Sequence, residues 1–346
     1  MKRAMITGVF GQDGSFLAEF LVRNGYEVFG LCRNNSGLQP LRHIPIYNHI
    51  NLIHCDLLDR ELLNKIIGDL SPHEIYNLAS QSLPSLSWAD PKQTIEPNCI
   101  GAVNIFEAVR AYSPETRVYQ ASSSEMFGES EELAHDENSV FNPKNPYAAT
   151  KVFSHQMAKI YREAYGLFIA NGILFNHESE RRPFHFVTQK VAYGAACASL
   201  GLTNSPDLTE DGVPIFVNNT LPMGNLEIYR DWGFAGDYVE AMQLMLQQDE
   251  PDDFIIATGE LHSIGDLCQT AFACAGKDWR DYVVNDSKFT RPSDATKSHA
   301  SISKAKNQLG WSPRLRFGGL VERMVVAQIN RLKDKLANSN VVPKQG

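Results

Sequence analysis

Short runs of β-branched and aromatic residues alternate with amphipathic stretches along the first half of the chain. In the amphipathic stretches the apolar residues recur with a helical period, as Phe16, Leu17, Phe20 and Leu21 do within 14–24. Further helices are predicted over 60–70, 103–112 and 146–165, and strands at Arg3–Thr7, Glu27–Cys32, Ile50–His54, Glu74–Leu78, Arg117–Ala121 and Leu167–Phe175. Because strands that alternate with helices build βαβ units, the pattern predicts an α/β fold around a parallel sheet.

The pattern changes after Asn176, where predicted loops lengthen and 203–220 is rich in Asn, Thr, Pro, Asp and Gly. A second, smaller lobe is therefore expected in the C-terminal half. The predicted division is a large domain at 1–180, to which the helix and strand of 232–258 return, a smaller lobe at 181–231 and 259–335, and a flexible polar tail at 336–346.

Composition and charge narrow the class of protein. The chain has 346 residues, 43% of them hydrophobic, and its 32 Lys and Arg against 40 Asp and Glu give a net charge of −8. An acidic chain does not derive its affinity from neutralising nucleic-acid phosphates, so no nucleic-acid partner is expected. No stretch approaches the roughly 20 apolar residues that cross a bilayer, and the first residues lack the apolar core of a signal peptide. We therefore expect a cytoplasmic protein with no membrane partner.

The cysteines show neither a CxxC pair nor clustering with histidine, so no metal site is expected. We interpret them as reduced, mostly buried thiols; they are Cys32, Cys55, Cys99, Cys197, Cys268 and Cys274.

A glycine-rich segment follows the first predicted strand and opens the first predicted helix. It reads TGVFGQDG over 7–14, and its cofactor candidates are Thr7, Gly8, Gly11, Gln12, Asp13 and Gly14. In this context the glycines allow a tight turn and close approach of the backbone to a pyrophosphate, which the start of the helix then favours. An ordinary strand-to-helix turn is the alternative, but the position of the segment favours a dinucleotide site.

The end of the second predicted strand bears on which dinucleotide is bound. NAD-binding proteins usually place a carboxylate there, whereas this chain has Cys32-Arg33-Asn34-Asn35. Arg33 can pair with a 2′-phosphate, so NADP is predicted; a solvated loop arginine is the alternative. After the third strand, Asp56 can accept a hydrogen bond from an adenine amine or cap the next turn.

Tyr147 and Lys151 lie four residues apart at the start of a predicted helix and therefore share a face. An ammonium beside a phenol lowers the pKa of the phenol, which can then accept a hydroxyl proton as hydride leaves the same carbon. The segment QASSSE over 120–125 follows the fifth strand, at the sheet edge where open α/β proteins bind ligands. There Ser123 can align the same substrate oxygen, and Glu125 can transfer a further proton; a serine-rich turn with a solvent-facing glutamate is the alternative.

Together these motifs resemble the extended short-chain dehydrogenases/reductases that act on nucleotide-sugars and, more narrowly, the GDP-mannose 4,6-dehydratase family. The resemblance runs from residue 1 to about 330 and is carried by TGVFGQDGSFLAE, QASSSEMFG, NPYAATK, YREAYG, GILFNHESERR, RDWG and LGWSP. It implies a Rossmann-type, doubly wound parallel sheet with a smaller C-terminal substrate lobe. It also implies oxidation of a hexose at C4, loss of water across C5 and C6, and return of the hydride to C6.

The resemblance assigns roles residue by residue. Tyr147 is the base at C4, Lys151 its support and ribose anchor, Ser123 the aligning hydroxyl and Glu125 the group acting at C5 and C6. Beyond the glycine-rich segment, the implied NADP contacts are Arg33, Asp56, Leu57, Leu78 and Ala79. The implied contacts to a GDP-sugar substrate are Ser82, Asn176, Glu178, Lys190, Arg230, Arg291 and Asp294. Arg230 can instead pair with Asp231 or Asp237, and Arg291 can be a loop charge. A homo-oligomer, dimer or tetramer, is also implied.

Four features depart from the family pattern. Ser123 stands where the family has Thr, Leu83-Pro84 where it tends to have His and a small apolar residue, and Asn98 where it usually carries Asp. The segment 202–221 is also longer than its counterpart. These changes leave open a related GDP-sugar such as a GDP-heptose. They also leave open an NADPH-dependent reductase or epimerase of a GDP-4-keto-6-deoxy sugar and, more remotely, a non-catalytic NADP-binding regulator.

Overall fold

The alternation of strands and helices builds a Rossmann-type parallel sheet, as predicted. The structure is a computed structural model that describes residues 1–33, 47–129, 134–209, 212–289 and 297–339. It divides into two units: unit 1 is Met1–His177, Ala235–Gly259 and Ser298–Pro313, and unit 2 is Glu178–Phe234, Glu260–Lys297 and Arg314–Gly346.

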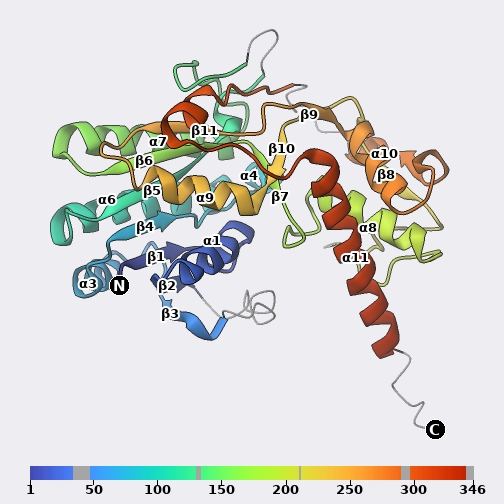
Figure 1. Ribbon diagram of the computed structural model, residues 1–346, viewed down its shortest axis with the longest axis horizontal. Coiled ribbons are helices and arrows are strands. Elements are labelled where there is room, and N and C mark those ends of the chain that lie inside the picture. Colours follow the sequence, from blue (N-terminus) through green and yellow to red (C-terminus); the bar gives the residue numbers. More distant parts are fainter. Residues whose placement is uncertain (34–46, 130–133, 210–211, 290–296, 340–346) are drawn as a thin grey trace. The chain divides into compact units, whose positions relative to one another are not determined.

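Unit 1 is built on the large parallel sheet (Figure 1). Within the described residues this sheet has seven strands in the order β11-β6-β5-β4-β1-β2-β3. The strand bounds are β1 Arg3–Thr7, β2 Glu27–Cys32, β3 Ile50–His54, β4 Glu74–Asn77, β5 Arg117–Ser123, β6 Ile169–Leu174 and β11 Asp253–Ile256. The order reverses between β1 and β4, which is where open α/β sheets bind ligands at the carboxyl ends of their strands.

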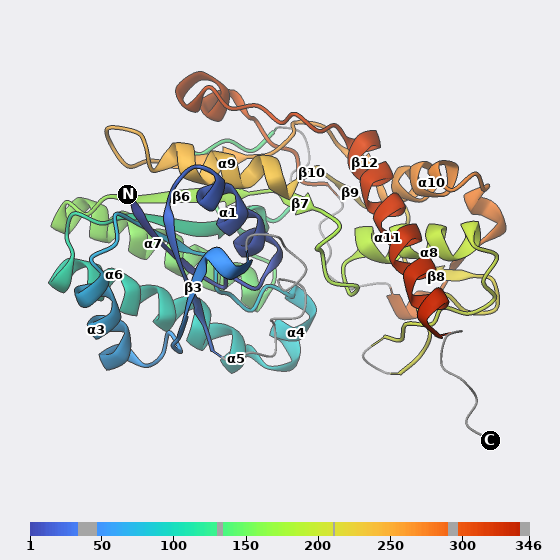
Figure 2. The same ribbon diagram turned by 60° about the horizontal axis from the view of Figure 1, so that its bottom comes forward.

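Helices cover both faces of the sheet (Figures 1 and 2). On one face α1 (Gln12–Arg23) packs beside α9 (Ala235–Met245). On the other lie α3 (Arg60–Leu70), α6 (Gly101–Tyr112) and α7 (Pro146–Tyr165), whose apolar sides bury a shared core with the sheet. The shorter helical segments of unit 1 are η2 Tyr47–His49, α4 Pro84–Ala89, α5 Pro91–Ile95, η3 Glu96–Ile100, η4 Ser124–Met126 and η7 Ala305–Leu309.

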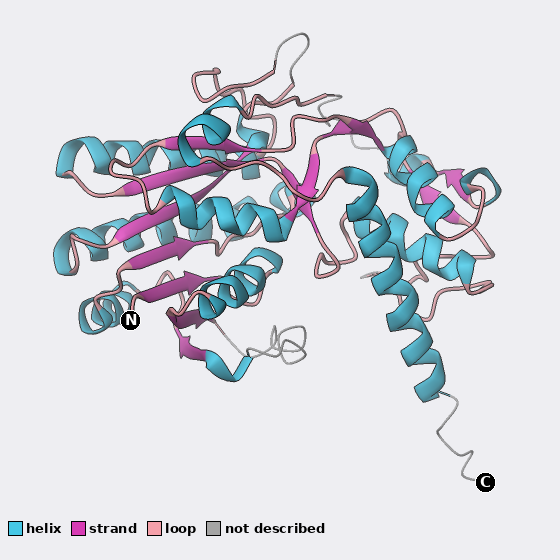
Figure 3. Cartoon of the chain, viewed as in Figure 1, coloured by secondary structure: helices cyan, strands magenta, loops and turns pink. Residues whose placement is uncertain are grey.

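Unit 2 is mainly helical, with short strand pairs (Figure 3). Helices α8 (Val187–Ser199), α10 (Ile264–Cys274) and α11 (Phe317–Ser339) bury one core, to which α8 contributes Tyr193 and the small residues Ala195 to Ala198. The chain enters along β7 (Asn176–Glu178). The remaining elements are β8 Leu221–Met223, β9 Tyr229–Arg230, β10 Trp232–Phe234, β12 His262–Ser263, β13 Val283–Asn285, η5 Trp279–Asp281 and η6 Ser287–Phe289.

Two of the predicted boundaries are wrong. Ser298–Pro313, predicted in the smaller lobe, belongs to unit 1: Ala300 pairs with His135, and the Trp311 indole donates to the Asp237 carbonyl at 2.9 Å. The predicted tail at 336–346 begins too early, because α11 continues to Ser339. Leu332, in the last third of this helix, is fully buried in the core of unit 2 and anchors the helix there.

Candidate active site

The glycine-rich segment forms the tight turn between β1 and α1. Gly8 has a φ of +69°, and its carbonyl accepts a hydrogen bond from the amide of Gly11 at 2.9 Å. A Cβ on Gly14 would lie 2.3 Å from the Gly8 oxygen, and one on Gly8 would lie 3.0 Å from backbone atoms of Ala79. The segment therefore folds only with glycine at these positions, and it leaves backbone at the start of α1 close to the end of β4.

Thr7 joins the ends of β1 and β4. Its hydroxyl accepts from the amides of Leu78 and Ala79, both at 3.0 Å, and donates to the side-chain oxygen of Asn77 at 2.9 Å. The predicted cofactor residues Thr7, Leu78 and Ala79 thus lie side by side.

Gln12 and Asp13, at the start of α1, both contact His177. The Asp13 carboxylate lies 2.8 Å from Nε2 of His177, and the Gln12 amide donates to the His177 carbonyl at 3.0 Å. The second ring nitrogen lies 2.7 Å from the Phe175 carbonyl. His177 was missed as a candidate although it lies in the NHESERR stretch, because only tertiary structure brings it to the glycine-rich turn.

The remaining cofactor candidates, Arg33, Asp56 and Leu57, differ in the exposure and the bonding of their polar groups. Arg33 is exposed at the end of β2, where its guanidinium can meet an anion. Asp56 caps the following turn by accepting from the amide of Leu58 at 3.0 Å, which is one of the two predicted uses. The Leu57 side chain is buried in the core, and its carbonyl accepts from the Asn104 side chain at 2.8 Å.

The residues of the glycine-rich turn, 7–14 in unit 1, fit a dinucleotide. The glycine turn leaves no space for side chains, and it opens onto the start of a twelve-residue helix, where backbone amides and the helix dipole favour phosphate.

The four predicted catalytic residues come together at the end of β5 and the start of α7. Helix α7 begins at Pro146 after the cap residue Asn145, whose side-chain oxygen accepts from the Ala148 amide at 2.8 Å. The same carboxamide donates to the Glu125 carboxylate at 3.1 Å. Asn145 therefore fixes both the helix start and Glu125; the sequence shows it only as a residue of the NPYAATK stretch.

Tyr147 and Lys151 lie on one side of α7, and both are buried. The Lys151 ammonium donates to the Ala121 carbonyl in β5 at 2.9 Å and lies 5.7 Å from the centre of the Tyr147 ring. Burial lowers the pKa of Lys151 to about 8, an effect that the Asp13 carboxylate partly offsets. The hydroxyl of Ser123, at the end of β5, accepts from the Glu125 amide at 3.2 Å.

Asn98 supports this arrangement from the π-helical turn η3. Its side-chain oxygen accepts from the Gln81 amide at 3.0 Å, and its NH₂ donates to the Gln81 carbonyl at 3.2 Å and to the Thr150 hydroxyl at 3.0 Å. The carboxamide thus holds the loop after β4 to α7 and is 4% exposed. An aspartate, which the family usually carries here, could not donate the two hydrogen bonds that this NH₂ group makes. Ser82, in the same loop, is exposed.

The predicted substrate residues fall in both units. Asn176, in unit 1, is half-buried. In unit 2, the buried Glu178 carboxylate accepts from the Thr188 hydroxyl at 2.6 Å and forms an ion pair with Arg182 at 3.1 Å. Glu178 is thereby committed to holding its own unit together.

Lys190 and Arg230 are partly buried cations of unit 2. The Lys190 ammonium donates to the Pro222 carbonyl at 2.6 Å and lies 3.5 Å from the centre of the Phe289 ring. Burial lowers its pKa to about 8, and the charge of Asp286 opposes this. The Arg230 guanidinium donates to the Tyr229 carbonyl at 2.8 Å. The predicted residues Arg291 and Asp294 lie outside the described residues.

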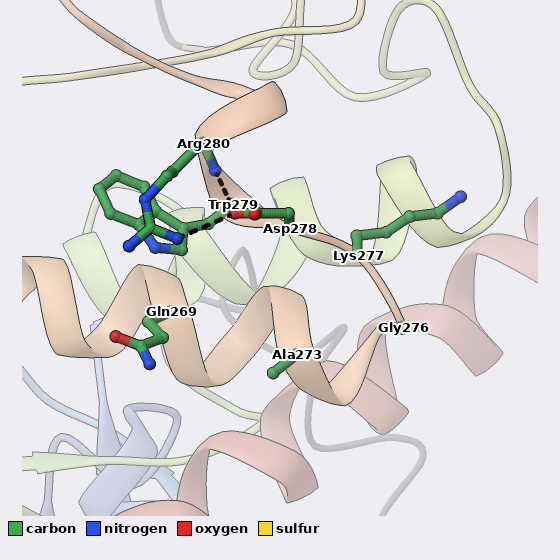
Figure 4. A pocket seen from close by; sticks show the side chains of 7 residues that line it. All are labelled: Gln269, Ala273, Gly276, Lys277, Asp278, Trp279 and Arg280. Atoms are coloured by element: carbon green, nitrogen blue, oxygen red, sulfur yellow. Dashed lines mark hydrogen bonds and ion pairs between the residues drawn. The ribbon is translucent and has the colours of Figure 1, made fainter.

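A separate pocket of about 330 Å³ opens in unit 2 beside the end of α10 (Figure 4). Gln269 and Ala273 line it from the helix, and Lys277, Trp279 and Arg280 from the segment that follows. It contains none of the predicted site residues.

Among the described residues there is no cluster of side chains suited to a metal ion and no helix long and apolar enough to span a membrane.

Fold and site together define a member of the extended short-chain dehydrogenases/reductases. Solved structures share the fold: UDP-glucose 4-epimerase from Thermotoga maritima superposes with a TM-score of 0.82 at 21% identity, covering 95% of this chain and 99% of that one. A protein named RMD from Pseudomonas aeruginosa, solved with NADPH, gives 0.77 at 21% identity over 96% of this chain and 100% of its own.

Sequence relatives narrow the class. A sequence model of the family described as GDP-mannose 4,6 dehydratase matches residues 5–324. GDP-mannose 4,6 dehydratase 2 of Arabidopsis thaliana is 43% identical over 94% of this chain and 86% of its own length. The human GDP-mannose 4,6 dehydratase is 38% identical over 95% and 92%, and that of Yersinia enterocolitica 35% over 96% and 95%. The chain belongs to the GDP-mannose 4,6-dehydratase family.

Proposed function

We propose that this protein is an NADP-dependent GDP-mannose 4,6-dehydratase, a lyase that forms the 4-keto-6-deoxy sugar. The observation that carries the proposal is the grouping of Ser123, Glu125, Tyr147 and Lys151 at the end of β5, in a chain of this family. The overall reaction oxidises C4, removes water across C5 and C6, and reduces C6.

Tyr147 is the proposed base for the C4 hydroxyl. Its phenol is buried beside the Lys151 ammonium, so the negative charge that develops as it gives up a proton lies next to a cation. Ser123, at the neighbouring strand end, is the proposed hydrogen-bond partner of the same substrate oxygen.

Glu125 is the proposed acid and base at C5 and C6. Once C4 is a ketone the C5 proton is acidic, so a carboxylate of ordinary basicity can remove it and then deliver a proton to the leaving C6 hydroxyl, which departs as water. The hydrogen bond from Asn145 fixes one carboxylate oxygen at 3.1 Å and keeps the group aimed during both transfers.

Bound NADP supplies the hydride acceptor and donor of this cycle. The glycine turn of 7–14 and the start of α1 are the proposed seat of its pyrophosphate, and exposed Arg33 the proposed partner of the 2′-phosphate. Binding of NADP at least tenfold tighter than NAD is expected by calorimetry. Arg33→Ala should remove most of that difference, and Arg110→Ala, which changes an arginine on α6, should not. Equal affinities would refute NADP specificity.

The proposed contacts to the GDP-sugar are Ser82, Asn176, Glu178, Lys190, Arg230, Arg291 and Asp294. Lys190 and Arg230 are suited to a diphosphate because they are cations with N–H donors. The Glu178 carboxylate is already paired with Thr188 and Arg182, so its proposed part is to position the backbone near the substrate.

A homo-oligomer, dimer or tetramer, is also proposed. Large apolar side chains are exposed along one set of packed helices, α4, α5, η3 and α7: they are Trp88, Ile95, Ile100, Phe153 and Ile160. Such a set is what a second copy of the chain would cover. Sedimentation velocity tests this, because a monomer at micromolar concentration would contradict it.

A cytoplasmic location is proposed because each of the six cysteines is free. Five are buried, and burial raises the pKa of Cys55, Cys99, Cys197 and Cys268, which keeps these groups as thiols in a reducing compartment. Fractionation of producing cells tests the location.

The main experiment incubates the purified protein with NADP and either GDP-mannose or a GDP-heptose and measures product mass. A product lighter by one water, without net NADPH, is expected with GDP-mannose. Tyr147→Phe should abolish it, whereas Tyr165→Phe, an exposed tyrosine of the same helix, should not. Absence of water loss with every GDP-sugar would refute the proposal. Net NADPH change or inversion at constant mass would indicate a reductase or epimerase.

A further inference from the structure

A buried histidine lies one turn beyond Lys151 on α7 and has no role in the reaction as derived above. Tyr147, Lys151 and His155 recur every fourth residue, so their side chains line one side of the helix. His155 is 2% exposed. A buried imidazole needs partners for both ring nitrogens, and here each partner comes from a strand of the sheet.

The ring connects α7 to two strands. Nδ1 lies 3.0 Å from the hydroxyl of Ser122, the residue before Ser123 in β5. Nε2 lies 3.5 Å from the carboxylate of Asp253, the first residue of β11. A third strand is joined through Asn171 of β6, whose amide donates to the His155 carbonyl at 3.3 Å and to Asp253 at 2.9 Å.

Asp253 is a charged partner of the imidazole. Burial by itself raises the pKa of Asp253, but His155 and Arg162 outweigh burial and hold the pKa well below its usual range. Arg162 donates to this carboxylate at 3.1 Å, and the Lys159 ammonium lies 3.8 Å away. The imidazole therefore lies between an ionised carboxylate at Nε2 and a hydroxyl at Nδ1, so that each ring nitrogen has a partner on a different strand.

Ser122, His155 and Asp253 are the residue types of a hydrolytic triad, but they cannot act as one. Ser122 is 4% exposed, and the His155 and Phe141 rings pack nearly perpendicular to each other, with centres 5.0 Å apart. No substrate carbonyl can approach the serine. The group is therefore a support within the fold.

We propose that His155 is a positioning residue of the dehydratase, which fixes α7, and with it Tyr147 and Lys151, against the end of β5 that carries Ser123. This inference rests on the proposed function. Lys151 makes a neighbouring tie to β5 through Ala121, but its ammonium also has to serve Tyr147 during the reaction. His155 supplies a tie that takes no part in the chemistry.

The test compares His155→Phe, His155→Gln and Ser122→Ala, with Ser154→Ala as a matched control. Ser154 is a fully buried serine of the same helix whose hydroxyl bonds only carbonyls of that helix, Thr150 and Lys151, among the described contacts. For His155→Phe we expect kcat per NADP-binding site to fall roughly 10- to 100-fold, the range that small misplacements of catalytic groups produce. KM for GDP-mannose and Kd for NADP should stay within about twofold.

Glutamine can still donate to Asp253, so His155→Gln should retain more of the wild-type kcat than His155→Phe. Ser122→Ala should lower kcat less than His155→Phe does, and Ser154→Ala should leave kcat unchanged. A folded His155→Phe with a lower Tm but wild-type kcat would overturn the proposal, because a purely structural role predicts that result. If His155→Phe does not fold, Ser122→Ala decides, and its wild-type kcat would overturn the proposal.

A second readout separates this inference from the proposed function. If the wild-type protein removes no water from any GDP-sugar, the proposed function fails and kinetics cannot be used. Hydrogen exchange of peptides covering 117–123 and 146–151 then tests the support directly. Faster exchange in both peptides in Ser122→Ala, but not in Ser154→Ala, is expected; unchanged exchange in both would overturn it.

Discussion

Lys151 is a buried cation that lowers the stability of the fold at neutral pH. Its pKa falls from 10.5 to about 8 because burial removes water from the ammonium. That difference corresponds to about 3 kcal/mol between the two protonation states. Since the folded pKa lies below the unfolded one, the unfolded chain binds more protons between pH 8 and 10.5. The free energy of unfolding should therefore rise with pH through this window.

Lys151→Met removes this titration. The free energy of unfolding of the wild type minus that of the variant should increase by about 1.3 kcal/mol between pH 7 and pH 9, from the two pKa values. The variant also removes the Lys151 hydrogen bond to the Ala121 carbonyl, which keeps the Gln120 amide as a donor at 3.3 Å; that loss is the same at each pH and cancels. Lys65→Met, an exposed lysine of α3 paired with Asp69, is the control and should show a constant difference.

Urea unfolding followed by circular dichroism at pH 7, 8 and 9, without cofactor, measures these differences. A wild-type minus Lys151→Met difference that is flat, or that falls with pH, would refute the reasoning, because it would mean that burial does not depress this pKa. In a separate assay without urea and with NADP, Lys151→Met should not dehydrate GDP-mannose, because the reaction requires the lysine whose burial lowers stability.

Three further substitutions test the packing. In Gly14→Ala the new Cβ would lie 2.3 Å from the Gly8 oxygen, so Kd for NADP measured by calorimetry should rise at least tenfold; an unchanged Kd would contradict the pyrophosphate cradle. In Gly172→Ala the Cβ would lie 2.2 Å from the Tyr119 hydroxyl, so the free energy of unfolding, measured by thermal unfolding, should fall by about 1–3 kcal/mol. An unchanged free energy would show that the strand can shift to make room. Asp253→Asn breaks a buried ion pair, so the free energy of unfolding at pH 7 should fall by about 3–5 kcal/mol. The difference from the wild type should shrink as the pH falls below about 4, where the carboxylate of the unfolded chain becomes protonated. Urea midpoints of the two proteins that do not converge at low pH would contradict this.

Much of unit 1 could be predicted from sequence because its signals are local. The strand runs and helical periods gave each strand of the large sheet to within a few residues, and the glycine spacing predicted the turn of 7–14. Tyr147 and Lys151 were placed on one helix face by their spacing alone. The predicted helix from 232 was partly wrong, since Trp232–Phe234 forms β10. The helix begins at Ala235, because a strand sequence leads there directly into the helical one.

The supporting contacts could not be predicted. Asn145 is a common helix cap, and its second bond to Glu125 joins residues 20 positions apart. The departure at Asn98 pointed toward the sugar, whereas the structure commits its carboxamide to Gln81 and Thr150. His155 is one more polar residue in an amphipathic helix until β11 brings Asp253 to it.

Periodicity and motif spacing were therefore enough to predict the sheet strands and longer helices of unit 1, because they encode which neighbours along the chain share a face; the helices of unit 2 were not predicted. Tertiary structure alone decided which buried polar groups meet, such as Asn171 and Asp253, 82 positions apart. It also decided that Ser298–Pro313 returns to unit 1. The physical reason is that a buried donor or acceptor must find a partner wherever packing supplies one, and strand order, which no local pattern specifies, determines which distant segments are near enough to do so.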